Sequence, residues 1–467
     1  MTSEYGTLTK TTALFAGANI AGKLLKLVII PLYTYYMTSA QLGTAETITI
    51  TAGLICLVIA SGANEAAIRF SMDENYTVEA VASNCFAVFA AGALPGIILC
   101  LLLSQIDAFK GHALLLILLT VMGAVDGLMS SLAKGIGENK VYAASEIVSS
   151  LALLISCVVA LVLLDAGLEG YLWSRIIAYA ARIIYIDLRT KLHRKLRMGV
   201  ISKDVMIPIV KFALPLMPSA LLWWIMDLSD RYIILWMLGP SSVGIYAIAC
   251  KLPSALTSLN VVFHQAWQLS AIRQYFKGDF REFYNTVLKA YSTFFFGAAA
   301  AIIAIARPLI QILDDSYEDA WRYIPLLLIA SVFMGLSGFT GVNYTVTGKT
   351  TGALTTSLVG AAVNLSLTLI LVRRLGIQGA AIASFAAYYV FWLIRTLHIK
   401  RELGTESGIA WIHLNMFVVL TESFCILSQQ SWYFVALCLA AFIVLNLNCI
   451  KAIISLIAGL LGNGKIK

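Results

Sequence analysis

The chain has 467 residues, of which 60% are hydrophobic and only 12% are charged, and its formal net charge at pH 7 is +8. A soluble globular domain carries about 25% charged residues, so this composition excludes an ordinary soluble enzyme or nucleic-acid-binding domain. It predicts an all-α protein that crosses a membrane many times. The eight cysteines lie in apolar stretches without a Cys-X-X-Cys pair, so we interpret them as core residues and expect no metal site.

Fourteen apolar runs are long enough to be membrane helices, which need about 20 residues each. In chain order they are predicted at residues 12–36, 44–69, 79–104, 113–136, 141–164, 168–189, 208–238, 243–269, 284–308, 322–347, 351–373, 377–399, 409–428 and 432–458. The longest connection, at residues 190–207, follows the sixth run and is strongly basic. The sequence therefore predicts about 14 transmembrane helices with a division near the middle of the chain.

The basic residues are unevenly distributed between the two sides of the membrane. If the N-terminus is cytoplasmic, the outer loops contain only four of the 33 lysine and arginine residues, namely Lys110, Arg322, Arg373 and Arg374. Lysine and arginine are retained preferentially in cytoplasmic loops. This asymmetry predicts a multi-pass protein of the cytoplasmic membrane with both termini inside.

The chain also contains an internal repeat. Residues 140–170 align without a gap on residues 349–379, which matches Gly167 with Gly376 and Gly170 with Gly379. Near the start of each half, Gly43 corresponds to Gly244. Internal repeats are typical of transporters, whose substrate path lies where the repeats meet. We predict two six-helix lobes, at residues 1–198 and 199–403, followed by a C-terminal helix pair at residues 404–467.

Two lysines lie deep within the first predicted helix. Lys23 and Lys26 are three residues apart and therefore share one helix face, about 16 Å from the start of the helix for Lys23. A cation near the middle of a hydrocarbon core of about 30 Å costs at least a few kcal/mol unless an anion or water faces it. The pair is interpreted as a phosphate-binding face, with a structural ion pair to Glu46, Glu65 or Asp126 as the alternative.

Further charged residues lie in other predicted spans. Arg231 and Lys251, with Arg175 as a weaker candidate, complete the predicted cationic site of Lys23 and Lys26. Arg231 follows Asp227 by four residues, so a helix salt bridge is its alternative role.

Acidic and proline residues in the spans suggest coupling and bending. Asp126, Asp227 and Asp230 are candidate sites for coupling to a proton or sodium gradient, and no other cofactor is expected. Pro215 and Pro218 each remove a helical hydrogen bond and predict a bend.

Several of these segments resemble the polysaccharide repeat-unit flippases of bacteria, within the multidrug/oligosaccharidyl-lipid/polysaccharide exporter superfamily. The resemblance is carried by Leu214-Pro215-Leu216-Met217-Pro218, Asp230-Arg231, Val243-Gly244-Ile245-Tyr246 with Lys251, Asn19 to Tyr36 with Gly43, and Leu375 to Ala381. It implies two six-helix lobes in a V around a central cavity that opens alternately to either side. It also implies transport of an undecaprenyl-pyrophosphate-linked oligosaccharide for O-antigen, capsule or exopolysaccharide biosynthesis, with membrane lipids and other assembly proteins as partners.

Three alternatives stay open at this point. A lipid II flippase of the same superfamily would have a similarly cationic cavity, whereas a multidrug or cation antiporter should have an acidic or aromatic one. A membrane glycan polymerase usually has large outer loops, which this chain lacks. No GxSxG, Walker or HExxH signature occurs in the sequence, so we expect a transporter and not an enzyme.

Overall fold

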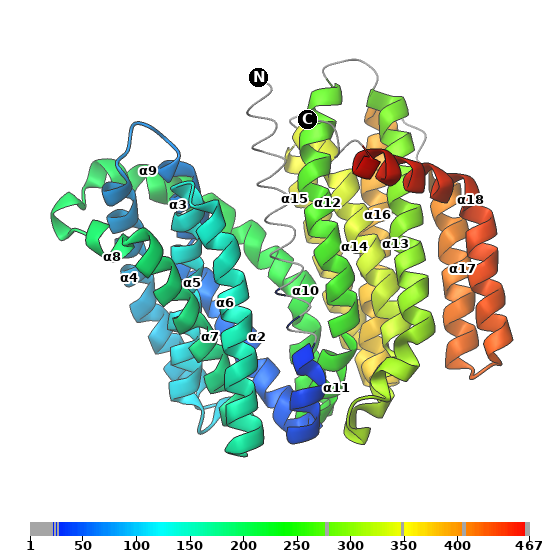
Figure 1. Ribbon diagram of the computed structural model, residues 1–467, viewed down its shortest axis with the longest axis horizontal. Coiled ribbons are helices and arrows are strands. Elements are labelled where there is room, and N and C mark those ends of the chain that lie inside the picture. The colour runs from blue at the N-terminus through cyan, green and yellow to red at the C-terminus, as the bar shows by residue number, and fades with distance from the viewer. Residues whose placement is uncertain are drawn as a thin grey trace. The chain divides into compact units, whose positions relative to one another are not determined.

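The computed structural model describes residues 22, 25, 28–275, 280–346, 350–403 and 408–462, and every regular element in these residues is a helix (Figure 1). Ten of the described helices are long and apolar enough to cross a membrane, or up to 12 if each of two bent pairs forms one span. The predicted all-α polytopic class is therefore confirmed. The first predicted span, at residues 12–36, lies largely outside the described residues.

The chain forms two compact units, Met1–Gly244 and Ile245–Lys467. The helices of the first unit are α2 (Ser39–Ala60), α3 (Ala63–Ser71), α4 (Val78–Leu103), η1 (Asp107–Phe109), α5 (Ala113–Gly135), α6 (Asn139–Cys157), η2 (Val158–Leu163), α7 (Gly167–Thr190), α8 (Leu192–Lys195), η3 (Met198–Val200), α9 (Lys203–Ala213), η4 (Leu214–Leu216) and α10 (Met217–Leu238). Next, α11 (Pro240–Ala249) runs across the division between the units. The predicted lobe boundaries, which differ from this division, stay a prediction.

The second predicted span, at residues 44–69, is in fact two helices. Helix α2 begins at Ser39, behind a capping box formed by Thr38 and Gln41, and ends where Ser61 and Gly62 take positive φ angles of 44° and 77°. A Cβ atom on Gly62 would lie 2.5 Å from the carbonyl oxygen of Ala213. A glycine is needed here because the chain turns in the left-handed region while it touches the end of α9.

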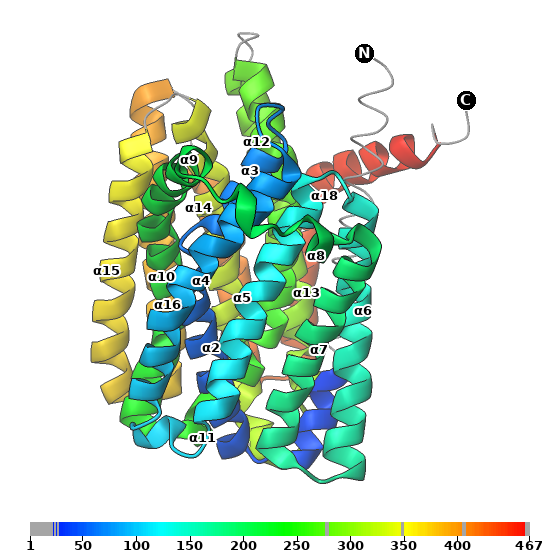
Figure 2. The same cartoon turned by 90° about the vertical axis from the view of Figure 1, so that its left-hand side faces the viewer.

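Helix α7 holds the first unit together. It packs against α2, α5 and α6, and α2 in turn packs against α4, α5 and α10. Figures 1 and 2 show α4 to α7 side by side along their lengths, with α8 and α9 at one end. Helix α7 is long enough to span a membrane but carries five charged residues, and it is not among the ten apolar spans. The charges far from its ends, Arg175 and Arg182, must therefore find partners inside the unit.

The second unit is organised around α14. Its helices are α12 (Lys251–Tyr275), α13 (Phe280–Ile310), η5 (Asp315–Arg322), α14 (Ile324–Val346), α15 (Thr350–Leu375), α16 (Ile377–Leu403), α17 (Ile409–Leu427) and α18 (Trp432–Gly462). Helix α14 contacts α12, α13, α16 and α17, while α17 and α18 pack on α13. Figure 1 shows α17 and α18 as an antiparallel hairpin at the edge of this unit, with the last turns of α18 lying across its end.

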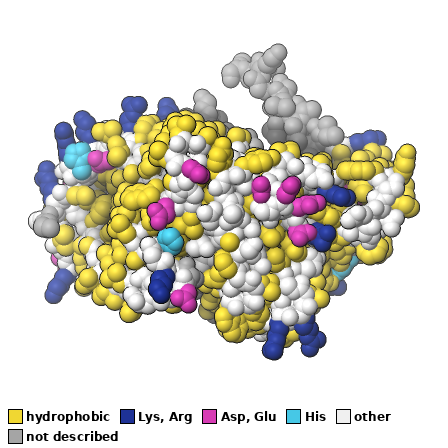
Figure 3. All heavy atoms as spheres, turned by 90° about the horizontal axis from the view of Figure 1, so that it is seen from below, with side chains coloured by type: hydrophobic (Ala, Val, Ile, Leu, Met, Phe, Trp, Pro, Cys, Tyr) yellow, Lys and Arg dark blue, Asp and Glu magenta, His cyan; other side chains and the backbone are white. Residues whose placement is uncertain are grey.

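Apolar side chains cover much of the surface, as expected for a protein surrounded by lipid. Trp236 is 77% exposed and Val444 is 73% exposed. Figure 3 looks onto the ends of the helices and shows apolar side chains mixed with uncharged polar groups and backbone, with charged groups scattered among them. An aqueous environment would disfavour such large apolar areas on a monomer, so the surface agrees with the many apolar helices.

The predicted repeat has the same local structure in both copies. The hairpin of α6 and α7 turns at Gly167, with φ at +48°, and the hairpin of α15 and α16 turns at the matching Gly376, with φ at +61°. Three residues later, Gly170 and Gly379 each lie against the preceding helix, where a Cβ atom would be too close. Both glycine pairs therefore serve the same function: a left-handed turn, then a close helix contact.

Candidate functional site

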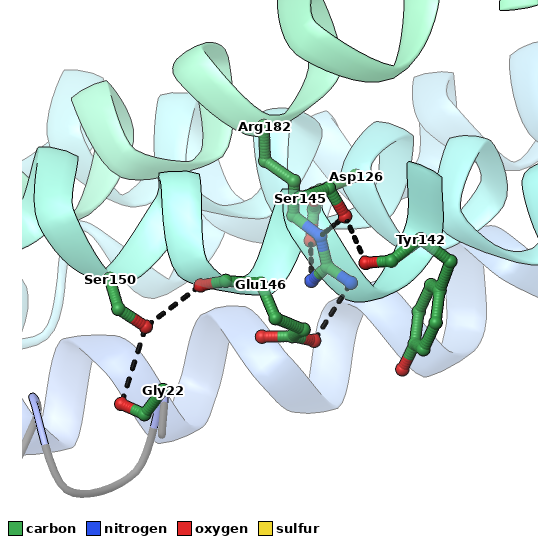
Figure 4. A network of polar contacts seen from close by, with 7 residues as sticks. All are labelled: Gly22, Asp126, Tyr142, Ser145, Glu146, Ser150 and Arg182. Atoms are coloured by element: carbon green, nitrogen blue, oxygen red, sulfur yellow. Dashed lines mark hydrogen bonds and ion pairs between the residues drawn. The ribbon is translucent and has the colours of Figure 1, made fainter. Parts of the chain in front are cut away.

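A buried cluster of charges in the first unit is centred on Arg182 of α7 (Figure 4). Its Nη1 lies 3.2 Å from Oδ2 of Asp126 on α5, and its Nη2 lies 2.8 Å from Oε1 of Glu146 on α6. Its Nε also donates to Oγ of Ser145, at 3.2 Å. One guanidinium therefore joins three helices, using the planar fork of donors that lysine lacks.

An aromatic ring and a second cation complete this cluster. The Cζ of Arg182 lies 5.5 Å from the ring centroid of Tyr142, and Nζ of Lys134 lies 4.7 Å from the same centroid. Two carboxylates and two cations thus share a site that is largely closed to solvent. Removing one member of such a set leaves a buried charge without its counter-charge, which is far more costly than losing a surface ion pair.

Asp126 was predicted as a coupling residue, and the structure places it in an ion pair with Arg182. Glu146, another acid within an apolar run, is the other acid of the same cluster. The sequence shows that both acids lie within apolar runs, but their spacing does not reveal that they contact the same arginine.

Lys23 and Lys26 lie outside the described residues. Their neighbour Gly22 is buried, and its carbonyl oxygen accepts a hydrogen bond from Oγ of Ser150 on α6, at 3.3 Å. Figure 4 shows this contact beside Glu146. Gly22 therefore lies against α6 one turn from the charge cluster, and a phosphate-binding role for the two lysines stays a prediction.

Arg175 lies two turns before Arg182 on α7 and faces a different set of residues. Its Nη1 donates to the hydroxyl of Tyr171 at 3.2 Å, and Glu46, a buried residue of α2, is among the groups that act on it electrostatically. The ring of Tyr171 packs edge-on against Tyr33 at 5.4 Å. Arg175 thus lies between α7 and α2, where its charge is partly balanced.

On α10, Arg231 pairs with Asp230 and not with the carboxylate of Asp227, which the four-residue spacing suggested. Nη1 of Arg231 lies 3.3 Å from Oδ1 of Asp230, its immediate neighbour, and donates to the backbone oxygen of Asp227 at 2.9 Å. The expected contact with the Asp227 carboxylate, four residues earlier, is replaced by a contact with its carbonyl. Asp230 is buried, whereas Asp227 is exposed.

The proline-rich segment and Lys251 both lie at breaks between helices. Pro215 is in the short η4, Pro218 is in the first turn of α10, and the axes of residues 203–216 and 220–238 differ by 42°. Lys251 begins α12, where the axes of α11 and the first part of α12 differ by 46°.

A second buried arginine holds three helices of the second unit. Arg395 of α16 is 4% exposed. Its Nε donates to Oγ1 of Thr356 at 3.1 Å, its Nη1 to the carbonyl of Ser337 at 2.8 Å and its Nη2 to Oγ of Ser357 at 3.2 Å. Its Cζ also lies 4.0 Å from the ring centroid of Phe391. Every hydrogen-bond acceptor recorded for it in the described residues is a neutral oxygen.

The start of α2 meets α11 in a reciprocal contact. The Oγ atoms of Ser39 and Ser241 are 2.6 Å apart. A Cβ atom on Gly43 would overlap the carbonyl of Pro240, and one on Gly244 would overlap the carbonyl of Ser39. In the repeat, Ser39 corresponds to Pro240 and Gly43 corresponds to Gly244. Gly43 touches Pro240 and Gly244 touches Ser39, so the contact is reciprocal. A local two-fold axis produces this pattern. The predicted match of Gly43 with Gly244 thus has a structural basis.

Comparison with known proteins gives both a family and a fold. A family model described as polysaccharide biosynthesis protein matches residues 8–267, more than half of the chain. The solved structure of the lipid II flippase MurJ, in an inward closed conformation, aligns with 94% of this chain and all of its own, with a TM-score of 0.75 and 13% identity.

Two multidrug transporters are also similar in fold. A point mutant of the MATE transporter VcmN of Vibrio cholerae aligns with 85% of this chain and 98% of its own, with a TM-score of 0.59 and 16% identity. An inward-facing MATE family transporter of the MOP superfamily aligns with 85% of this chain and 96% of its own, with a TM-score of 0.64 and 13% identity. No curated protein sequence matches significantly. At these identities the structures establish the fold alone.

Replacing Arg182 with glutamine should destabilise the first unit by about 3 to 5 kcal/mol, because two buried carboxylates lose their shared guanidinium. The measurement is thermal unfolding of the purified protein in detergent. Arg189→Gln is the matched control, since Arg189 is an exposed arginine on the same helix. Equal melting temperatures for the two variants would contradict the role of Arg182.

Replacing Arg395 with glutamine should cost less, about 1 to 3 kcal/mol, because it leaves neutral hydroxyl and carbonyl groups without a donor instead of buried charges. The same unfolding measurement should therefore rank Arg395→Gln between Arg189→Gln and Arg182→Gln. A larger loss than that of Arg182→Gln would show that the Arg395 charge has an essential counter-charge.

Proposed function

We propose, since the chain belongs to the polysaccharide biosynthesis protein family, that it is a flippase for an undecaprenyl-pyrophosphate-linked oligosaccharide. The substrate would move from the inner to the outer leaflet of the bacterial cytoplasmic membrane, for O-antigen, capsule or exopolysaccharide biosynthesis. Both termini would be cytoplasmic, and other polysaccharide-assembly proteins would be partners. The observation that carries this proposal is the family match combined with a transporter fold.

The physical demand of this transport is the transfer of a pyrophosphate through hydrocarbon. A charged headgroup crosses only if protein groups replace its water of hydration. We assign this role to Lys23, Lys26, Arg231 and Lys251, with Arg175 as a weaker member. An ion pair of the two lysines with Glu46, Glu65 or Asp126 is the alternative to this substrate role.

The transport cycle would be alternating access between the two repeats. The reciprocal contact of Ser39 and Gly43 with Pro240, Ser241 and Gly244 supports this, because contacts between repeat-equivalent segments are the ones that a rocking motion must break and remake. Its small residues and single hydroxyl pair can separate without exposing a large apolar surface.

Coupling to a proton or sodium gradient would use Asp126, Asp227 or Asp230. Asp126 has the strongest support, because it shares Arg182 with Glu146. The two carboxylates are balanced by Arg182 and Lys134, and a proton or a sodium ion bound to one carboxylate would release its cationic partner.

Transport of lipid II is the second candidate. The observation in its favour is that the alignment with the lipid II flippase MurJ covers 94% of this chain. Both substrates would present a pyrophosphate and a polyprenyl tail, so the same cationic residues would serve either. The sugar part alone distinguishes them.

Expression of this chain in a strain that lacks its own repeat-unit flippase should restore surface glycan and remove accumulated lipid-linked units. Replacing both Lys23 and Lys26 with alanine should abolish the rescue, because the pyrophosphate would then meet no cation on the first helix. Immunoblotting of membranes would establish equal insertion of the two proteins.

Rescue by the double variant at wild-type levels would exclude the two lysines and leave the flippase function intact. A wild-type protein that restores a lipid II flippase mutant, and not the repeat-unit mutant, would replace the proposed substrate with the second candidate.

Cysteines at positions 39 and 241, in a variant without the eight native cysteines, should form a disulfide on oxidation, because the two native hydroxyl oxygens are 2.6 Å apart. The cross-link should stop transport, and reduction should restore it. Ser39→Cys with Ser242→Cys is the matched control, since Ser242 points toward Leu238 and not toward α2. Undiminished transport by the cross-linked protein would show that this contact does not open.

A further inference from the structure

The C-terminal helix pair has an apolar outer face and a polar inner one. On α17 and α18 the exposed side chains are large and apolar, as in Phe417 at 67%, Phe424 at 68% and Leu437 at 65%. The buried face of α17 contains Asn415 and Glu422, and that of α18 contains Asn446. This arrangement suits helices that meet lipid on one side and bind their neighbours through polar groups on the other.

The two asparagines of this face are hydrogen-bonded to each other and to neighbouring groups. Thr293 of α13 donates to Oδ1 of Asn446 at 2.8 Å, and Nδ2 of Asn446 donates to Oδ1 of Asn415 at 2.8 Å. Nδ2 of Asn415 donates to the carbonyl of Trp411 at 3.0 Å. These hydrogen bonds join α17 and α18 to α13 at one level of the membrane.

Glu422 lies on the same face of α17, seven residues or two turns beyond Asn415. It is 1% exposed, and its Oε1 has no hydrogen-bond partner among the described residues. Glu422 is therefore a buried titratable group near these hydrogen-bonded asparagines, and it forms no hydrogen bond with them in the described residues.

The helices packed around Glu422 offer it little charge. Helix α17 contacts α13, α14 and α18. Cys438 of α18 lies close enough to interact electrostatically with Glu422. Cys425 of α17 lies beside Cys438. Residues 324–343 of α14 contain no charged or titratable side chain. On α13, the charged residue after position 290 is Arg307, whose Cζ lies 5.3 Å from the ring centroid of Trp321.

An ionised carboxylate in such a place would be held without a counter-charge in a medium of low dielectric, which is strongly unfavourable. A neutral carboxylic acid avoids that cost. We propose that Glu422 is a proton-binding site at the joint of α17 with α13 and α18, and that it keeps its proton at neutral pH while this joint is closed. Loss of the proton then requires water or a cation to enter the joint. The site is independent of the substrate and of the first-helix lysines.

The test compares the thermal unfolding of the wild-type protein and Glu422→Gln in detergent between about pH 6 and pH 8. Glutamine has the same shape and no charge, so this variant should fold. An unfolded glutamate is ionised in this range, since its ordinary pKa is about 4.3. The folded wild type therefore holds one proton more than the unfolded chain, and its unfolding equilibrium should rise about tenfold per pH unit relative to the variant. Parallel melting temperatures across this range would overturn the proposal.

A second measurement needs no variant. Dicyclohexylcarbodiimide adds to a protonated carboxyl group: the proton moves to a carbodiimide nitrogen, a carboxyl oxygen bonds to the central carbon, and the adduct rearranges to a stable N-acylurea with nothing released. At about pH 7 mass spectrometry should locate the label on Glu422 and not on Glu146, whose carboxylate lies 2.8 Å from Arg182. Labelling of Glu146 in preference to Glu422 would overturn the assignment.

Discussion

The constraint on which the rest of the structure depends is that a charge inside a membrane protein needs an internal partner. Two arginines meet this constraint on corresponding helices, four residues or about one turn apart in the register of the repeat. Arg182 extends from α7 to α5 and α6, and Arg395 extends from α16 to α14 and α15. Each is carried by the second helix of a repeated hairpin and holds it to the two preceding helices. The hydrogen bonds of a guanidinium can bridge three backbones at once, which explains why an otherwise costly group lies between helices that could have packed through leucine alone.

The repeat is most evident at glycines, where the backbone needs a positive φ angle or a close helix contact. Gly167 and Gly376 both turn the chain with a positive φ, and Gly43 and Gly244 both allow helices to approach more closely than a side chain permits. Elsewhere the copies have diverged, because any apolar residue of suitable volume can fill a lipid-facing or core position. Glycine is harder to replace at these positions, so it retains the repeat while neighbouring residues change.

Much of the fold could be predicted from apolar runs, since a helix that crosses lipid must be long and apolar. The boundaries were less predictable: the run at 44–69 conceals a turn at Ser61 and Gly62, which is set by contact with Ala213. For the site, the sequence could show which kinds of residue are buried, but not which of them contact one another. A buried acid such as Asp126 stands out in a hydrophobic run, but its partner comes from a helix 56 residues later. Arg395 lies near the end of a predicted run, and that position does not reveal the oxygens of Ser337 and Thr356 that surround it.

The two arginine clusters also differ in a way that bears on function. Around Arg182, two carboxylates and Lys134 bring the local charge close to zero and place titratable groups in the first half of the chain. Around Arg395, the hydrogen-bonding oxygens in the described residues are neutral, so the positive charge is dispersed but not cancelled. The first cluster thus holds its arginine by ion pairs, whereas the second holds its arginine by neutral oxygens, and the two halves of the chain stabilise a buried cation in different ways.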